Sequence, residues 1–172
     1  MHEIVPTATD IILLVNPKNP LTGVLTKDLA AAADKLGLRL HMLHASTDLD
    51  LQRAFAEMEQ SRAGGLVIAS DAFFNSRSQQ LAELTIKHTL TAIYQYRKFV
   101  AAGGLLSYGG SITDVYREAG VYVARVLKGE KPADMRVQQA TKVELIINLK
   151  TAKALGINVP LDILGRADEV IE

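Results

Sequence analysis

Residues 92–110 read AIYQYRKFVAAGGLLSYGG. A short apolar segment comes first and leads into Tyr94, Tyr96 and Arg97. A glycine pair then interrupts the chain, and a second short apolar segment follows. Strand-like and helix-like segments alternate before this stretch, whereas one long amphipathic helix and a tail follow it. The stretch is therefore predicted to hold two strands at which the two parts of the fold meet.

Four short apolar segments in the first part have the composition of strands in a parallel sheet. They lie at residues 11–15, 38–43, 66–69 and 92–94. The helices between them are predicted at residues 22–37, after an N-cap at Ser46, Thr47 or Asp48, and at residues 79–88. This alternation predicts an α/β fold, a doubly wound parallel sheet with right-handed crossovers and flavodoxin-like layering. The second strand is the least apolar and is expected near an edge. Residues 70–77 are expected to form a loop.

The second part of the chain is predicted to begin with a helix over residues 111–127. Ser111 is followed three residues later by Asp114, which resembles a capping box with Asp in place of Glu or Gln. A strand over residues 143–148 and a short helix over residues 149–155 come next. The long helix has an apolar stripe that needs a partner surface, formed by Ile112, Val115, Ala119, Tyr122, Val123 and Val126.

The composition is that of a globular protein without bulk charge. Hydrophobic residues make up 48% of the 172 residues, and Lys plus Arg equal Asp plus Glu at 19 each. The lack of a positive field argues against nucleic acid as a partner, and the lack of cysteine excludes disulfides and thiolate metal sites. No run reaches the roughly 20 apolar residues of a membrane span. The first residues do not resemble a signal peptide, so the chain as printed is expected to stay in the cytoplasm.

Polar and aromatic side chains follow the predicted strands at their carboxyl ends, where an open α/β sheet binds its ligand. The mixture suits a small ligand with a flat or apolar body and polar ends. The residues are Asn16, Asn19, Asp71, Phe74, Asn75, Tyr94 and Tyr96.

Each of these residues also has a purely structural interpretation. Asn16 with Pro17 is typical of a turn, and Asp71 with Asn75 could cap the helix at residues 79–88. The two adjacent phenylalanines could plug the end of the sheet. One of the two tyrosines after the fourth strand is expected to face the core, because side chains alternate along a strand.

Other kinds of site do not fit the residue spacing. The four histidines do not cluster, so no metal site is predicted. The Ser-Tyr-Gly-Gly-Ser segment at residues 107–111 lacks both common phosphate-loop spacings and is interpreted as a capped helix start. No nucleophile is followed by a plausible base. We therefore expect neither an enzyme nor a cofactor.

The chain resembles the substrate-binding proteins of ABC-type uptake systems, in the group that includes tryptophan and tyrosine uptake. The resemblance covers nearly the whole chain, and the C-terminal motif is the most specific part of it. The matching segments are residues 14–17, 71–75, 94–109, 125–134, 141–156 and 167–172.

The resemblance implies a type I periplasmic-binding fold, in which two lobes clamp an amino-acid-like molecule between them. The protein delivers this molecule to an ABC permease, and the present chain would supply one of the two lobes. Such proteins are periplasmic and close to twice this length, so the chain would match the second lobe of a truncated protein. We expect one α/β domain over residues 1–172. Residues 10–98 would be the lobe core, residues 99–132 a crossing strand and helix belonging to the missing lobe, and residues 133–172 the return strand and tail.

An exposed apolar helix would be costly in water. We therefore expect either that the strand at Leu105 joins the edge of its own sheet, or that two chains form a homodimer through residues 111–127. The ligand contacts implied by the resemblance include Tyr108 from the crossing strand. Asp71 would face a ligand amine, and amides near Asn16 a carboxylate. The alternative is a stand-alone flavodoxin-like domain that binds a ligand or signals.

Overall fold

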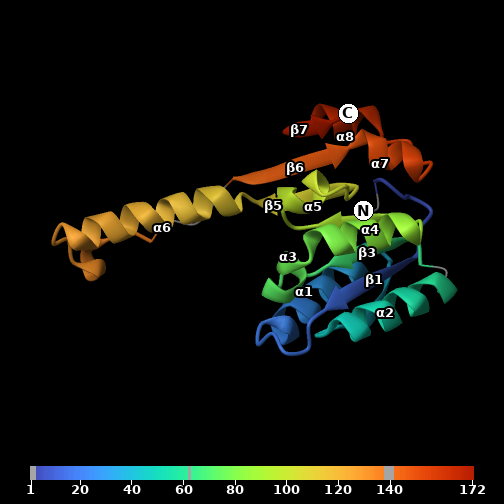
Figure 1. Cartoon of the computed structure of the whole chain (residues 1–172), viewed down its shortest axis with the longest axis horizontal. Coiled ribbons are helices and arrows are strands. Elements are labelled where there is room, and N and C mark those ends of the chain that lie inside the picture. The colour runs from blue at the N-terminus through green and yellow to red at the C-terminus, as the bar shows by residue number, and fades with distance from the viewer. Residues whose placement is uncertain (1–2, 62, 138–141) are drawn as a thin grey trace.

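The computed structural model describes residues 3–61, 63–137 and 142–172 (Figure 1). Its strands are β1 (Asp10–Val15), β2 (Arg39–His44), β3 (Gly65–Ile68), β4 (Ala92–Tyr94), β5 (Leu106–Gly110), β6 (Val143–Asn148) and β7 (Glu169–Ile171). Its helices are α1 (Thr22–Lys35), α2 (Asp48–Gln60), α3 (Ala72–Ser76), α4 (Ser78–Lys87), α5 (Arg97–Ala101), α6 (Ile112–Leu127), α7 (Leu149–Ala154) and α8 (Leu161–Gly165), with a 3-10 turn η1 at Pro132–Asp134.

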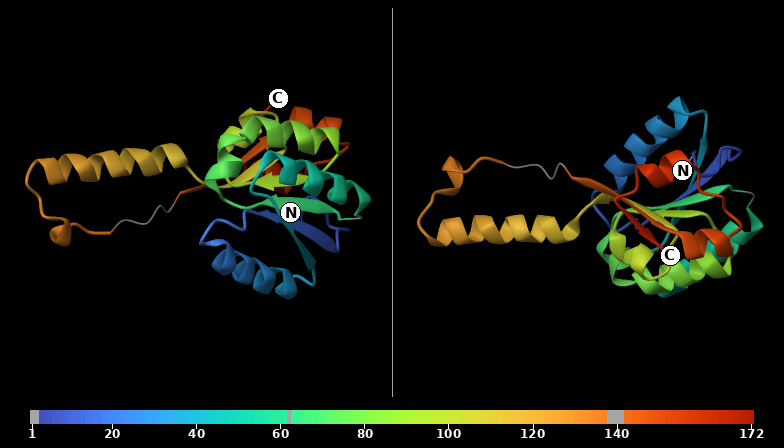
Figure 2. Two further views of the ribbon diagram at one scale, coloured as in Figure 1. Left: turned by 60° about the horizontal axis from the view of Figure 1, so that its bottom comes forward. Right: turned by 90° about the horizontal axis from the view of Figure 1, so that it is seen from above.

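The strands of the described residues form a single sheet in the order β2-β1-β3-β4-β5-β6-β7. All neighbouring strands are parallel except β5 and β6, which are antiparallel. Helices lie on both faces of the sheet (Figure 2). The predicted doubly wound α/β fold is therefore confirmed, as is the edge position of β2.

The larger hydrophobic core lies between one face of the sheet and the helices α2 to α5. Leu51, Phe55 and Met58 point into this core from α2, as their helical spacing predicts, and each is at most 1% exposed. On the opposite face α1 covers β1, where Leu29 packs against the cluster that holds Leu13. Both faces of β1 are thus covered.

The glycine break before β5 allows a close approach of the chain to the core. A Cβ atom at Gly104 would lie 2.6 Å from the ring of Tyr94 and 2.8 Å from the carbonyl oxygen of Phe99. β5 then pairs with β4, with Ser107 opposite Tyr94. This confirms the prediction that the strand at Leu105 joins the edge of its own sheet.

Four short elements differ from the sequence prediction. The loop expected over residues 70–77 is wrong, because residues 72–76 form α3 and the side chain of Asp71 caps it. The five-residue helices α5 and α8 and the three-residue β7 also have no counterpart in the prediction. Elements of this length are too short to show a hydrophobic period.

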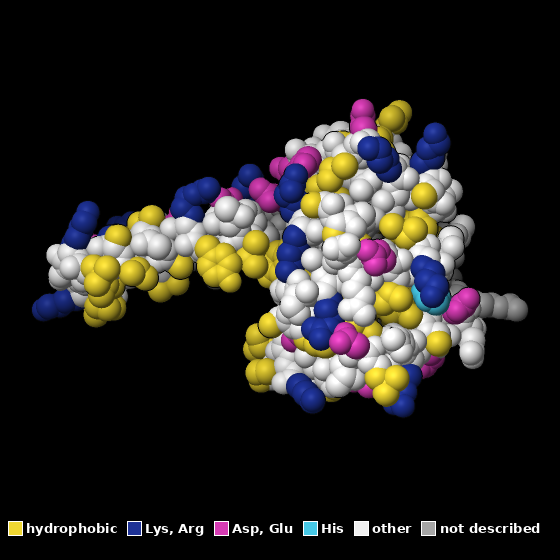
Figure 3. All heavy atoms as spheres, in the orientation of Figure 1, with side chains coloured by type: hydrophobic (Ala, Val, Ile, Leu, Met, Phe, Trp, Pro, Cys, Tyr) yellow, Lys and Arg dark blue, Asp and Glu magenta, His cyan; other side chains and the backbone are white. Residues whose placement is uncertain are grey.

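The helix α6 projects from the body of the molecule (Figure 1). Its cap is as predicted, since Ser111 Oγ accepts a hydrogen bond from the backbone N–H of Asp114 at 3.3 Å. The hydroxyl of Tyr122 donates to the carbonyl of Arg136, so the segment after the helix runs back beside it. No residue of α6 is buried, and hydrophobic side chains gather along one side of the projecting arm (Figure 3). The apolar stripe has no partner surface in the described part of the chain.

Candidate ligand-binding site

Three polar side chains from two loops meet at the carboxyl end of the sheet. Asn16 Nδ2 donates to Asp71 Oδ1 at 2.9 Å, and Asn19 Nδ2 donates to Asp71 Oδ2 at 2.9 Å. Asn16 and Asp71 are buried, at 9% and 8% exposure. The loops meet because β1 and β3 are parallel neighbours and therefore end at the same edge. We call these three residues the Asn-Asp-Asn network.

Local hydrogen bonds hold the two asparagines in place. The backbone N–H of Lys18 donates to Asn16 Oδ1 at 3.0 Å, and that of Leu21 donates to Asn19 Oδ1 at 2.9 Å. Thr22 Oγ1 donates to the carbonyl of Asn16 at 2.6 Å. Each asparagine therefore shapes the turn with its oxygen and presents its amide nitrogen to the carboxylate. The turn interpretation of Asn16 is confirmed, and its contact with a ligand stays a prediction.

The carboxylate of Asp71 keeps one acceptor position free of described partners. Oδ1 accepts from Asn16 and from the backbone N–H of Phe73, at 2.8 Å, which is the capping bond of α3. Oδ2 accepts one described hydrogen bond, from Asn19. Because an ionised carboxylate offers about four lone-pair sites, a ligand ammonium can add to Oδ2 without displacing any of these partners. Asp71 caps α3 rather than α4.

Tyr96 connects this network to a neighbouring cleft. Its hydroxyl lies 3.3 Å from Oγ of Ser70, the residue before the aspartate. A cleft of about 270 Å³ opens beside it, and Arg97, Ser107 and Ser111 contribute to its lining. The strand ends thus offer amide, hydroxyl, carboxylate and guanidinium groups within one region.

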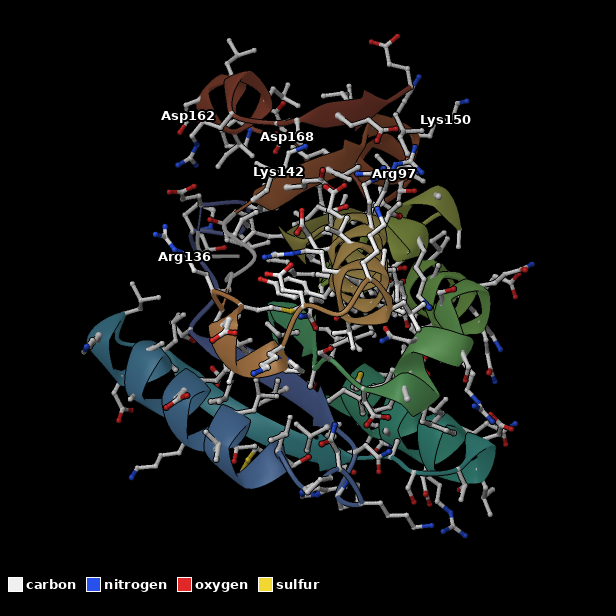
Figure 4. The ribbon with its side chains drawn as sticks, turned by 90° about the vertical axis from the view of Figure 1, so that its left-hand side faces the viewer. Arg97, Arg136, Lys142, Lys150, Asp162 and Asp168 are labelled. Atoms are coloured by element: carbon white, nitrogen blue, oxygen red, sulfur yellow. The ribbon has the colours of Figure 1, made fainter. Side chains whose placement is uncertain are left out.

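Arg97 is held by the C-terminal strand. Its Nε and Nη2 atoms donate to the two carboxylate oxygens of Glu169 at 2.6 and 2.5 Å. These hydrogen bonds lower the pKa of Glu169 and raise the pKa of Arg97. Figure 4 shows Arg97 and, from the start of β6, Lys142 on the same side of the molecule, and Lys142 pairs with Glu144 at 2.9 Å. Arg97 and Lys142 thus each have a carboxylate partner.

Phe74 and Tyr94 do not lie at this surface, although both were expected to contact ligand. They are 0% and 1% exposed and belong to the core under α2 to α5. The ring of Tyr94 stacks on Phe99 with centroids 4.8 Å apart, its hydroxyl lies 2.7 Å from Thr85 Oγ1, and burial raises its pKa. The expectation of ligand contacts is corrected for both residues, and Tyr94 is the strand tyrosine that faces the core.

Asn75 lies beside the network, and Tyr108 lies away from it. The backbone N–H of Asn75 donates to the carbonyl of Asp71 at 2.8 Å, but neither side chain has a described hydrogen bond to the network. Asn75 lies in α3, and its backbone carbonyl accepts a hydrogen bond from Lys98 Nζ. Tyr108 is 63% exposed and lines a different hollow, on the face of the sheet that carries α1. A ligand contact of Asn75 stays a prediction. A ligand at the network would not reach Tyr108 if it stayed on the side of the sheet that carries α3.

Two groups near the strand ends were not expected from the sequence. Gln95 Oε1 is buried with no hydrogen-bond partner among the described residues, which is an unusual position for a polar atom. The guanidinium of Arg77 lies 3.9 Å from the ring centre of Phe73 and pairs with Asp48 at 2.5 Å. The position of Gln95 between two tyrosines at a strand end could have marked it as a candidate site residue. Nothing in the sequence indicated that Arg77 pairs with Asp48, which lies 29 residues earlier.

The described ranges contain no group of three or more His, Asp or Glu side chains placed to hold a metal ion. They also contain no helix whose length and apolar character would let it cross a membrane.

A family model described as ABC transporter substrate binding protein matches residues 1–171. The chain belongs to the ABC transporter substrate-binding protein family. This is a family of binding proteins rather than of enzymes, in agreement with the expectation from the sequence. A comparison with curated protein sequences gives no significant match.

Solved structures share the fold of this chain. A conserved domain protein from Vibrio cholerae has a TM-score of 0.88 and 25% identity, over 98% of this chain and 57% of its own. An ABC domain in complex with L-Trp from Streptococcus pneumonia has a TM-score of 0.88 and 23% identity, over 99% and 59%. A ligand-free, open substrate-binding protein with adhesive properties from Clostridium difficile has a TM-score of 0.71 and 20% identity, over 98% and 56%. The chain spans between 56% and 59% of the length of these proteins.

Proposed function

We propose that this chain is part of the solute-binding component of an ABC-type uptake transporter, and that it binds an amino-acid-like molecule and delivers it to a permease. The single observation that carries the ligand class is the carboxylate of Asp71, buried at the strand ends with one acceptor position unused. Family membership supports the solute-binding role. The bound L-Trp of the streptococcal structure makes an aromatic amino acid the first ligand to test.

In this proposal each group of the site recognises a different part of the ligand. The free position on Asp71 Oδ2 accepts a hydrogen bond from the ligand ammonium, and Asn19 fixes the carboxylate that receives it. Amide groups near Asn16 donate to the ligand carboxylate. Tyr96 borders the ligand side chain from the end of β4. A charge-assisted hydrogen bond to a buried carboxylate is among the stronger contacts available to a small ligand.

The length comparison supports a two-lobed parent, in which the chain supplies one lobe and the ligand lies between the two. Residues 99–132 then form the crossing region, with α6 packed on the other lobe, and the parent works in the periplasm. When the 172-residue chain is alone, its exposed α6 drives association into a homodimer through residues 111–127. Both parts of the proposal give the apolar stripe of α6 a covering surface.

Isothermal titration calorimetry with L-Trp, L-Tyr and 3-indolepropionate tests the ligand class, because the last compound lacks the amine. We expect the two amino acids to bind and the amine-free analogue to give no heat. Asp71→Asn should weaken amino acid binding about tenfold or more, the usual cost of losing a charged hydrogen-bond partner. Asp28→Asn, which removes an exposed carboxylate on α1, is the matched control and should bind as the wild type does.

Circular dichroism must show a folded Asp71→Asn variant for the comparison to count. Asp71→Ser removes the charge, keeps a side-chain oxygen that can cap α3 and serves as the second variant if the amide does not fold. Amino acid affinity within twofold of wild type in the folded variant would refute the amine role of Asp71. Equal binding of 3-indolepropionate and L-Trp would refute an amino-acid-like ligand.

A further inference from the structure

One face of the sheet is incompletely covered. The face is the one that carries α1. We define the open sheet face as the exposed or half-buried residues of β3 to β6 on this side, which are Val67, Ile93, Tyr108, Val143 and Leu145. They line a hollow of about 700 Å³ together with the buried Leu106. Tyr108 and Val143 are 63% and 46% exposed.

The hollow exists because the helices on this face stand apart. Leu29 of α1 lines one side of it, and Ile163 and Arg166 at α8 line the other. Parallel strands are normally buried on both faces, under helices. Here β3, β4 and β5 are parallel neighbours, yet among the described residues no helix lies over their centre on this side. The open sheet face lacks one covering helix.

The same chain has one helix without a covering surface. On α6 the apolar residues recur at helical spacing on one side, and the most exposed of them are Tyr116 at 71%, Val123 at 58% and Leu127 at 82%. The 16 residues of α6 give a length of about 24 Å. The five-residue β5 is about 17 Å long, so the helix can run the whole length of the hollow.

A chain cannot place its own α6 in its own hollow. The strand β5 ends at Gly110, and α6 begins at Ile112, so the helix leaves the sheet directly beyond the end of β5. The return strand β6 begins at Val143 beside Gly110. Both ends of the excursion are thus fixed in the sheet at one point, and the helix extends away from the body (Figure 1).

We infer that α6 of one copy docks on the open sheet face of a second copy, and that the exchange is reciprocal about a two-fold axis. This inference rests on the proposed association of two chains, and it names the surface that receives the helix. Each chain has one uncovered apolar helix and one uncovered apolar sheet face. Reciprocal docking covers all four surfaces in a closed, isologous dimer, whereas pairing of α6 with α6 leaves both sheet faces in water.

The proposed contact between α6 and the open sheet face is mainly apolar, so the dimer should depend little on salt. The apolar stripe of α6 carries no charge. Three charged residues line the hollow, and each has a partner within the chain: Arg166 pairs with Glu3, and Asp168 accepts a hydrogen bond from the backbone N–H of Leu145. Screening by salt weakens exposed ion pairs and leaves burial of apolar area intact. The dimer should therefore persist at high ionic strength.

Cysteine cross-linking of the full chain tests the docking mode, because the chain has no cysteine of its own. One variant carries Val123→Cys on α6, and the other carries Leu145→Cys on the open sheet face. Mixing the two under mild oxidation should give a disulfide-linked dimer, and each variant alone should give little. Cross-linking of the Val123→Cys variant with itself would overturn the inference in favour of paired α6 helices. No cross-linking in the mixture would also overturn it.

Light scattering of substituted chains gives an independent measurement. Val123→Glu on α6 and Tyr108→Glu on the open sheet face should each convert the dimer to a monomer. Val121→Glu is the control, because Val121 lies two residues from Val123 and so on the opposite side of α6. A dimer that survives Tyr108→Glu, or a wild-type chain that is a monomer, would refute the reciprocal exchange.

The result of the docking experiments can be distinguished from the result of the ligand-binding experiments. Amino acid binding is measured by calorimetry on the same variants, and the Asn-Asp-Asn network contains none of the substituted residues. A chain that binds an amino acid but does not exchange α6 refutes this inference alone. A chain that exchanges α6 but gives no heat with any amino acid refutes the ligand class alone.

Discussion

Gly104→Ala tests whether the close approach before β5 is required by the core. The new Cβ atom would lie 2.6 Å from Tyr94 Cε2 and 2.8 Å from the carbonyl oxygen of Phe99. Real Cβ atoms essentially never come within 3.0 Å of another heavy atom, so part of the structure must move. The substitution adds a single methyl group and changes no charge or hydrogen-bond donor.

The size of the effect follows from what surrounds the clash. Reaching an ordinary contact of 3.4 Å requires the ring of Tyr94 to move by about 0.8 Å, the difference between 3.4 and 2.6 Å. That ring stacks on Phe99 at 4.8 Å, and its hydroxyl is 2.7 Å from Thr85 Oγ1. The carbonyl of Phe99 cannot move freely either, because Gly104 N donates to it at 2.8 Å. Overpacking costs about 1–3 kcal/mol, and a strained hydrogen bond adds about 1 kcal/mol.

We therefore expect Gly104→Ala to lower the free energy of unfolding by about 2–4 kcal/mol, measured by urea denaturation with circular dichroism. Gly23→Ala is the matched control. A Cβ atom at Gly23, in the first turn of α1, meets no atom within 4 Å. Replacing glycine by alanine in a helix without a clash is neutral or stabilises by up to about 1 kcal/mol. If Gly104→Ala stayed within about 0.5 kcal/mol of the wild type, the packing argument would be refuted.

Three further substitutions address the core, a cap and an ion pair, and each is measured by denaturant unfolding. Leu51→Ala should cost about 2–5 kcal/mol because Leu51 is 0% exposed, whereas Leu49→Ala, at a site 54% exposed, should be nearly neutral, and equal effects would contradict the assigned core. Thr47→Ala should cost about 1 kcal/mol because its side chain caps α2, and Thr47→Ser should recover most of this. Glu169→Gln should cost at most about 1 kcal/mol at pH 7 because the pair with Arg97 is exposed. Since Arg97 lowers the pKa of Glu169, the stabilisation is present above the unfolded pKa of about 4.3 and is lost as the pH falls through the folded value, so the two proteins should become equally stable in acid.

The long elements of the fold could be predicted because burial leaves a pattern in the sequence. The continuous apolar run of β1 indicates a strand covered on both faces, and the spacing of Leu51, Phe55 and Met58 identifies the inner side of α2. The predicted bounds of β6 agree with the structure, because Asn148 ends the apolar run and caps the helix that follows. In each case the local sequence pattern agrees with the position of the element in the folded protein.

The site could be predicted only to the level of the strand ends. The topology places Asn16, Asn19 and Asp71 at one edge, and this follows from the strand pattern alone. The direction of single aromatic side chains does not follow from it. Strand alternation says that Tyr94 and Tyr96 face opposite ways without saying which one faces the core. Phe74 was misplaced because the loop expected there is a short helix, which turns Phe74 inward against the core.

The pairing of Gly110 with Val143 has a consequence for how this chain could change over time. Gly110 and Val143 lie at adjacent positions on antiparallel strands, so in topological terms α6 sits inside a greatly lengthened hairpin connection. A two-residue turn can join antiparallel strands. The projecting arm can therefore be lengthened, exchanged or removed by insertion and deletion within one connection, while the register of all seven strands stays as it is.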